Sequence, residues 1–138
     1  MTKRSSSHDP AAGRVLALAA VFGLLGVAAG AFGAHGLRGT VPARDLEIWQ
    51  TAAHYQQLHA AVLVGVAVLG RGGFSKALRV AAVAFGVGIV IFSGSLDAMV
   101  LGGPRMLGAI TPIGGLCLMA GWAGLAVHGL SLARKPDA

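Results

Sequence analysis

The chain has 138 residues, of which 55% are hydrophobic and only 12% are charged, and its mean hydropathy is +0.73. A soluble domain carries about 25% charged residues because its surface faces water, so this composition excludes an ordinary soluble domain. The net charge of +6 comes from basic residues that stand singly between apolar blocks, unlike the basic patch of a nucleic-acid-binding protein. We therefore expect one membrane domain whose partner is the lipid bilayer, and no nucleic-acid partner.

Residues 1–13 are small and polar, and we expect them to form a disordered cytoplasmic tail. Four apolar segments follow, each long enough to cross a hydrocarbon core of about 30 Å as a helix. The helices are expected at about residues 15–37, 46–70, 78–101 and 107–132. The predicted fold class is all-α: a four-helix transmembrane domain over residues 14–133, followed by a cytoplasmic tail at 134–138.

Two helix starts carry local signals. The second helix is expected to have Thr40 near its cap, Pro42 in its first turn and Asp45 shortly after. The fourth apolar segment is longer than the bilayer requires, so part of it is expected in the interface or in a loop around Thr111 and Pro112.

The orientation follows from lysine and arginine, which are enriched in cytoplasmic loops. One side of the predicted membrane domain carries eight basic residues: Lys3, Arg4, Arg14, Arg71, Lys76, Arg79, Arg134 and Lys135. The other side carries three: Arg38, Arg44 and Arg105. Both termini are therefore predicted to be cytoplasmic.

A cleaved secretory signal is an alternative for the first helix. A basic start, an apolar run and the small residues from Ala28 to Ala31 fit it. The apolar run, however, exceeds the usual signal core of about 7–15 residues. We expect the helix to be retained.

Polar side chains gather toward the predicted outer ends of all four helices. The residues are His35, His54, Tyr55, Gln56, Gln57, His59, Ser93, Ser95, Asp97 and Thr111. Polar groups are costly in lipid, so they face other helices or a water-filled cavity. We expect hydrogen bonds between helices; a ligand or proton site and a metal site are the alternatives.

Asp97 is the acidic residue of this cluster, about one turn before the predicted end of its helix. A carboxylate at the membrane centre costs about 2.5–3.5 kcal/mol, and less near the interface. We expect an interfacial acid paired with Arg38, Arg105 or a protonated histidine. A proton or cation site is the alternative.

A metal site would need side chains from several helices. His54 and His59 are five residues apart, about 140° around a helix, so they do not readily share one ion. His35 and Asp97 would have to complete such a site. The single cysteine, Cys117, excludes an intrachain disulfide and a cysteine-based metal site. We expect neither a metal nor a cofactor.

Glycines are abundant, at 22 residues, and are expected at close contacts between helices. The positions assigned to packing are Gly26, Gly30, Gly33, Gly114, Gly115 and Gly121. Gly114 and Gly115 after Pro112 alternatively mark a broken helix that lines a site.

Four motifs together resemble the YgdD/YwdK-like family of small bacterial inner-membrane proteins, a domain of unknown function. They are GAFGAHGL (30–37), WQTAAHYQQLHA (49–60), FSGSL (92–96) and ITPIGG (110–115) with Gly121-Trp122. The resemblance covers roughly residues 15–130 and implies a multi-pass plasma-membrane protein without an established activity. Members usually carry an aromatic residue, often tyrosine, where this chain has Asp97, so a role for this acid would be particular to this chain.

No catalytic constellation is visible, and we expect a non-enzymatic protein that acts through helix contacts, as a homo-oligomer or as a subunit with a membrane-protein partner. A small oligomeric transporter or channel that uses the outer polar cluster is the alternative. Both hypotheses place the chain in the bacterial inner membrane.

Overall fold

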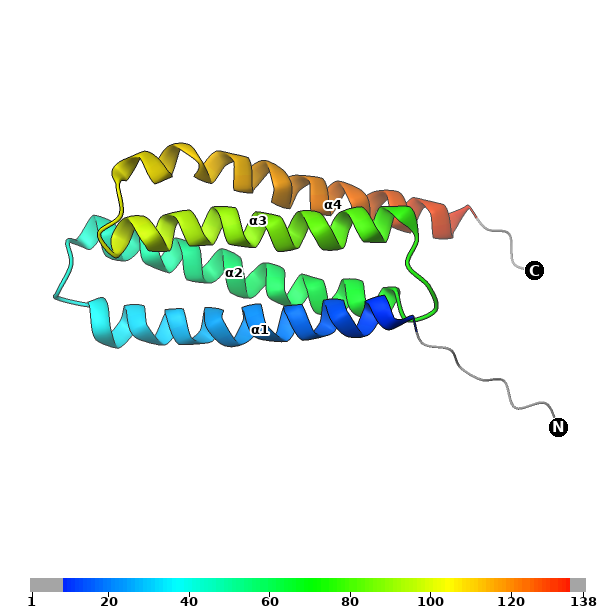
Figure 1. Ribbon diagram of the computed structural model, residues 1–138, viewed down its shortest axis with the longest axis horizontal. Coiled ribbons are helices and arrows are strands. Elements are labelled where there is room, and N and C mark those ends of the chain that lie inside the picture. Colours follow the sequence, from blue (N-terminus) through cyan, green and yellow to red (C-terminus); the bar gives the residue numbers. More distant parts are fainter. Residues whose placement is uncertain (1–8, 135–138) are drawn as a thin grey trace.

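The computed structural model describes residues 9–134, and all structural statements below concern this part of the chain. The predictions for residues 1–8 and 135–138, including those for Lys3, Arg4 and Lys135, lie outside it. The elements in chain order are α1 (Pro10–Phe32), a π-helical turn η1 (Gly33–Leu37), α2 (Ala43–Leu69), α3 (Lys76–Val100), a 3-10 helix η2 (Arg105–Ala109) and α4 (Thr111–Ala133) (Figure 1). The predicted all-α class and the four spanning helices are confirmed.

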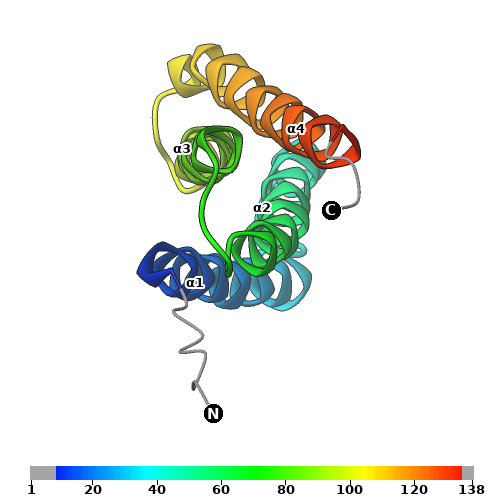
Figure 2. The same ribbon diagram turned by 90° about the vertical axis from the view of Figure 1, so that its right-hand side faces the viewer.

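The four helices are stacked in sequence order and do not form a closed square. α1 packs mainly on α2, α2 on α3, and α3 on α4, so that α1 and α4 lie on opposite sides of the molecule (Figure 2). Each outer helix therefore leaves most of its circumference uncovered. The start of α1, the α2–α3 loop and the end of α4 lie at one end of the molecule (Figure 1).

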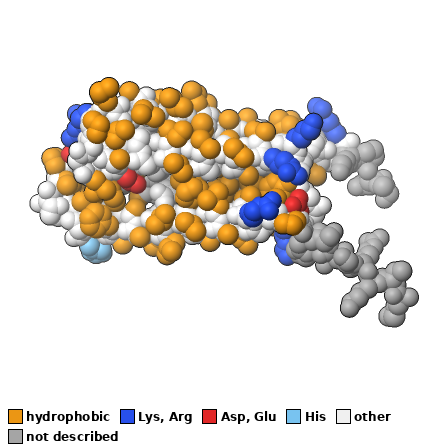
Figure 3. Space-filling view, viewed as in Figure 1, with side chains coloured by type: hydrophobic (Ala, Val, Ile, Leu, Met, Phe, Trp, Pro, Cys, Tyr) orange, Lys and Arg blue, Asp and Glu red, His pale blue; other side chains and the backbone are white. Residues whose placement is uncertain are grey.

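The core lies between α2 and α3 and is completed by a few side chains from α1 and α4. Leu63 and Val66 of α2 and Leu78 and Phe85 of α3 are fully buried. Apolar side chains cover the middle of the outer surface, while lysine and arginine lie toward its two ends (Figure 3). This distribution fits a protein whose middle faces lipid and whose ends face water.

The predicted start of the first helix is wrong. Residues 10–13, assigned to a disordered tail, form the first turn of α1, and Asp9 is its N-cap. The Asp9 carboxylate accepts a hydrogen bond from the backbone N–H of Ala11 at 2.8 Å, and Pro10 occupies the first helical position. An acceptor at the cap followed by proline is a standard start signal, because proline lacks only an N–H that the helix does not use there.

The predicted start of the second helix is also wrong. α2 begins at Ala43, three residues before the predicted residue 46, with Pro42 as its N-cap and Asp45 in its first turn; Thr40, predicted near the cap, lies before the helix. The Thr40 hydroxyl instead donates to the carbonyl of Leu37 at 2.9 Å, which satisfies the end of the preceding helical turn. Gly39 has φ 80°, a left-handed conformation that glycine adopts without steric cost.

The fourth predicted helix is two elements. The sequence predicts a helix over 107–132, with part of the segment in the interface or in a loop around Thr111 and Pro112; in the structure η2 ends at Ala109 and α4 begins at Thr111, with Pro112 in its first turn. Proline is tolerated in a first turn and not in a helix interior, which explains the break. α3 begins at Lys76, two residues earlier than expected, because the Ser75 hydroxyl accepts from the Leu78 N–H and caps it.

Candidate functional site: polar side chains between the helices

The structure divides the predicted polar cluster into a buried group and an exposed group. The buried side chains, each less than a tenth exposed, are Gln56, His59, Ser93, Ser95 and Thr111. His35 and His54 are exposed, Tyr55 is 39% exposed, and Asp97 is half-buried. The cluster is therefore not one cavity lined by all of these residues.

His59 lies at the centre of the buried group and is only 3% exposed. Its Nδ1 is 2.8 Å from the Tyr55 carbonyl, and its Nε2 is 3.3 Å from the indole Nε1 of Trp122. The indole N–H only donates and the carbonyl only accepts, so the proton of the neutral ring is on Nδ1. Both ring nitrogens are occupied by partners within the chain.

Aromatic rings enclose the His59 ring. Tyr55 stacks on it at a centroid distance of 5.8 Å, and Phe85 and Trp122 lie at 5.6 and 6.2 Å. Phe92 stacks on Tyr55 at 4.5 Å and extends the group toward α3. We call His59 and these four residues the aromatic cluster. It joins α2, α3 and α4 and exposes neither imidazole nitrogen to a ligand.

Polar side chains of α2 bind the backbone of α1. The Trp49 indole donates to the Ala29 carbonyl at 2.7 Å, and the Gln56 amide to the Phe22 carbonyl at 3.0 Å. The Gln57 amide donates to the Gly26 carbonyl at 2.7 Å. Each of these carbonyls belongs to the α1 helix and has two lone pairs. One lone pair serves the helix, and the other accepts the hydrogen bond from α2.

Two glycines of α1 and the first glycine of η1 lie opposite these α2 side chains. A Cβ at Gly26 would be 2.8 Å from the Gln57 side chain, and one at Gly33 would be 2.6 Å from the Trp49 ring. A Cβ at Gly30 would lie 3.0 Å from the Gln57 amide nitrogen. Small residues at these three positions let the α2 side chains reach the α1 carbonyls.

Glycines also mark the contact between α3 and α4. A Cβ at Gly121 would lie 2.6 Å from the Phe85 ring, and one at Gly114 would collide with the backbone of Phe92. Gly115 differs, because a Cβ there would meet the Phe92 ring only at 3.9 Å, an ordinary contact. Gly114 and Gly115 lie within the continuous helix α4, and the break in this segment lies before Thr111, so the alternative of a helix broken at these two glycines is wrong.

The serine and threonine hydroxyls are bonded within the chain as well. Ser93 donates to the Ala52 carbonyl of α2 at 2.8 Å. Ser95 and Thr111 share a hydrogen bond at 2.8 Å that links α3 to the start of α4. These hydroxyls therefore tie neighbouring helices together.

The expected ion pair of Asp97 is absent from the described residues. Arg105, a candidate partner, instead makes a bidentate pair with Asp45 at 2.8 and 3.1 Å, which links η2 to the first turn of α2. The Asp97 Oδ1 atom is buried and has no hydrogen-bond partner within residues 9–134. The prediction of a neutralised interfacial acid is thus wrong for Asp97 and applies to Asp45.

The three histidines of the predicted polar cluster do not converge in the described part of the chain. His35 lies in the π-helical turn η1 and His54 on the outer surface of α2, both exposed, whereas His59 is enclosed. No group of three or more His, Cys, Asp or Glu side chains in residues 9–134 is arranged to hold a metal ion.

The part of the chain that makes most of these contacts matches a known protein family. The model of the family described as "Protein of unknown function (DUF423)" matches residues 29–115, which run from the end of α1 to the first turns of α4. The chain belongs to this family. The match includes Trp49 and all five residues of the buried polar group.

Relatives of this family are named as membrane proteins. The UPF0382 inner membrane protein YgdD of Escherichia coli is 38% identical over 121 residues, which cover 88% of this chain and 92% of the relative. A UPF0382 membrane protein of Staphylococcus haemolyticus is 42% identical over 76% of this chain and 85% of its own. YwdK of Bacillus subtilis is 41% identical over 76% and 86%. No solved structure matches the chain. The protein is a multi-pass protein of the bacterial inner membrane.

Sequence reasoning missed three structural groups. Trp122 is the hydrogen-bond donor to His59, and no local pattern in the sequence joins these two residues. Asp45 and Arg105 are 60 residues apart and no local pattern joins them. Asp9 also accepts from the Phe74 N–H at 3.1 Å and so fastens α1 to the α2–α3 loop; the Asp9-Pro10 pair was its only local signal.

Proposed function

We propose that this protein acts through contacts between helices in the membrane, as a homo-oligomer or as a small accessory subunit, and not as an enzyme. One observation carries the proposal: the buried polar side chains bind other parts of the same chain, while the two outer helices present apolar faces. The apolar faces of the outer helices are therefore the surfaces on which we expect helix partners to pack.

The buried polar groups leave little for a substrate. His59 uses both nitrogens, and Ser93 and Gln56 donate to carbonyls of neighbouring helices. A transport pathway would need polar groups that face a water-filled passage. The hydrogen bonds within the chain favour a role in holding the helices together. A hydrogen bond between membrane helices contributes about 0.6–2 kcal/mol to stability.

The apolar faces of α1 and α4 are available for partners. On α1, Leu24 is 71% exposed, and on α4, Met119 is 67% exposed. In a membrane such positions contact lipid or another helix, and association there depends on packing because lipid is equally apolar. A chain of four helices with two uncovered outer helices suits a subunit that packs on both sides.

Site-specific photocrosslinking in the native membrane tests this proposal. A photoreactive residue at Leu24 or Met119 is expected to yield adducts with a second polypeptide. The same residue at Leu63, which is fully buried, serves as the matched control and is expected to yield none. Native mass spectrometry then identifies a multiple of 13.8 kDa or a different subunit.

The proposal fails if neither outer position forms an adduct with protein and the purified chain remains a single copy. Proton or ion flux above that of empty liposomes, abolished by His59→Leu, would favour the transporter alternative instead. His59→Leu removes the buried imidazole and keeps an apolar side chain at the centre of the aromatic cluster.

The orientation is a separate part of the proposal: both termini face the cytoplasm. Arg14, Arg71, Lys76, Arg79 and Arg134 lie toward the end of the molecule that has the start of α1 and the end of α4, and Arg38, Arg44 and Arg105 lie toward the other end. This asymmetry follows the positive-inside rule. Alkaline phosphatase fused after residue 138 is expected to be inactive and a fluorescent protein bright; the reverse would overturn the orientation.

A further inference from the structure

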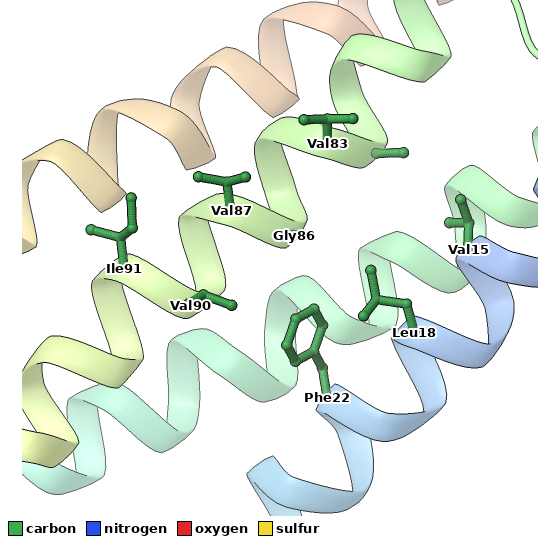
Figure 4. A pocket seen from close by; sticks show the side chains of 9 residues that line it. Val15, Leu18, Phe22, Val83, Gly86, Val87, Val90 and Ile91 are labelled. Carbon is green, nitrogen blue, oxygen red and sulfur yellow. The ribbon is translucent and has the colours of Figure 1, made fainter.

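An apolar groove runs between α1 and α3 on one face of the molecule (Figure 4). We call it the α1–α3 groove and define it by Leu18, Phe22, Gly86, Val87 and Val90. The exposed residues on the α3 side of this groove are aliphatic, and Val87 and Val90 are 43% and 59% exposed. A groove of this composition accepts a hydrocarbon chain.

Asp97 lies on the same stripe of α3 as the groove. Gly86, Val90 and Asp97 are separated by four and seven residues, which places them along one helix face. The Asp97 Oδ1 is buried without a hydrogen-bond partner in the described residues. Asp97 as a residue is only partly buried, so a ligand that supplies a donor can approach the carboxylate from its exposed side and offset the cost of an unpartnered carboxylate in a membrane protein.

The depth of Asp97 suits the headgroup region of a bilayer. α3 has 25 residues, which correspond to about 37 Å of helix against a hydrocarbon core of about 30 Å. Asp97 is three residues before the end of α3, so it lies near the boundary of the hydrocarbon. Val87 is ten residues, or about 15 Å, further in, which equals one leaflet of the core.

We propose that Asp97 and the α1–α3 groove bind a phospholipid with a primary ammonium headgroup. The ammonium N–H groups donate to the Asp97 carboxylate while one acyl chain occupies the groove. Charge complementarity selects this occupant, because a quaternary choline headgroup has no N–H and a glycerol headgroup leaves the lipid anionic. The inference does not depend on the proposed function, since it concerns lipid binding by a single chain.

Native mass spectrometry of the full chain tests the headgroup preference. The protein is titrated with phosphatidylethanolamine, phosphatidylcholine and phosphatidylglycerol of identical acyl chains. Wild type is expected to retain phosphatidylethanolamine about tenfold more strongly than phosphatidylcholine, the lower limit for a hydrogen bond to a charged group. Asp97→Asn is expected to abolish this preference, and Asp97→Glu to keep part of it. Glu47→Gln, at an exposed carboxylate near the same end of the molecule, is the matched control and is expected to change nothing.

A second variant tests the groove. Val90→Phe fills it and is expected to weaken retention of all three phospholipids, whereas Val127→Phe on the exposed face of α4 is expected to have no effect. Circular dichroism establishes that each variant is folded.

Equal retention of the three headgroups by wild type would overturn the proposal, as would a preference that survives Asp97→Asn. A dimer that excludes lipid and dissociates in Asp97→Asn would assign the groove to a second copy and also overturn it. The lipid measurement is read on the mass of one chain, so it stands or fails separately from the crosslinks that test the proposed function.

Discussion

Trp122 of α4 donates its indole N–H to Nε2 of His59 on α2, at 3.3 Å, and so joins two helices that otherwise have few contacts. The bond fixes the imidazole tautomer, because a ring with its proton on Nε2 would place two N–H groups opposite each other. The ring of Phe85, on α3, lies 5.6 Å from the His59 ring and 5.6 Å from the Trp122 ring. The relationship therefore couples three helices through one side-chain pair.

Replacing Trp122 with phenylalanine is expected to lower the free energy of unfolding by about 1–2 kcal/mol, because His59 loses its donor and leaves a buried nitrogen unpaired. Unfolding in mixed micelles measures the change. Nitrogen NMR of wild type is expected to show the neutral ring protonated on Nδ1, and a ring protonated on Nε2 would contradict the structure. His54→Ala, at an exposed histidine, is the control and should leave stability unchanged.

Gln56→Leu tests the contact between α1 and α2. The variant keeps the side-chain volume and removes the hydrogen bond to the Phe22 carbonyl, so we expect a loss of about 0.6 kcal/mol, the average for such contacts in membranes. The same micelle unfolding assay measures it. Gln50→Leu, on the exposed side of α2, is the matched control. Equal stability of Gln56→Leu and Gln50→Leu would show that the bond contributes nothing.

Gly114→Ala and Gly115→Ala compare a glycine that close helix packing requires with a neighbouring glycine that it does not require. The Gly114 Cβ would collide with the Phe92 backbone, and overpacking of this kind costs about 1–3 kcal/mol. The Gly115 Cβ would meet the Phe92 ring at 3.9 Å, so that variant is expected to be neutral or slightly stabilising. The melting temperatures of the two variants in detergent distinguish them. Similar values would refute the placement of α4 on α3.

The Asp9 cap predicts a pH dependence. Hydrogen bonds from the backbone N–H groups of Ala11 and Phe74 hold the pKa of Asp9 below its ordinary value of 3.8. A carboxyl whose pKa is lowered on folding stabilises the fold fully above that ordinary value, and this contribution disappears as the pH falls through the lower, folded pKa.

Asp9→Ala is therefore expected to be less stable than wild type at pH 7, and the difference is expected to shrink only below about pH 4. Thermal unfolding from pH 7 to pH 2 follows the difference. A difference that vanished between pH 7 and pH 5 would contradict the cap, since no carboxyl with a lowered pKa titrates there. Asp45→Ala is an unsuitable control because it breaks an ion pair, so Glu47→Ala is used.

The sequence was sufficient to predict the four helices, because length and hydropathy decide whether a segment crosses a bilayer. It was less informative about helix ends, where single side chains decide: Asp9 caps α1 and Thr40 does not cap α2. The buried polar residues were recognised by type, yet their partners are often backbone carbonyls, as for Gln56 and Ser93. Every residue has a backbone carbonyl, so the sequence does not show which carbonyl accepts such a hydrogen bond.

Charge pairs were harder to predict for another reason. Arg105 is near both Asp45 and Asp97 in the expected topology, and only the arrangement of helices in space decides between them. The bidentate pair to Asp45 leaves Asp97 without a charge partner in the described residues. The absence of a charge partner for Asp97 in the described residues therefore follows from the arrangement of the helices and not from the sequence.

The hydrogen bonds of the first two helices have a consequence for biogenesis. Trp49, Gln56 and Gln57 all donate to α1, and Ser95 and Thr111 pair within the second helical hairpin. Each hairpin thus satisfies polar groups of its own before it meets the other. We expect the α1–α2 bonds to form in the translocon while the second hairpin is still being synthesised, and the Ser93, Trp122 and Arg105 bonds to α2 to form only when the two hairpins dock in the bilayer.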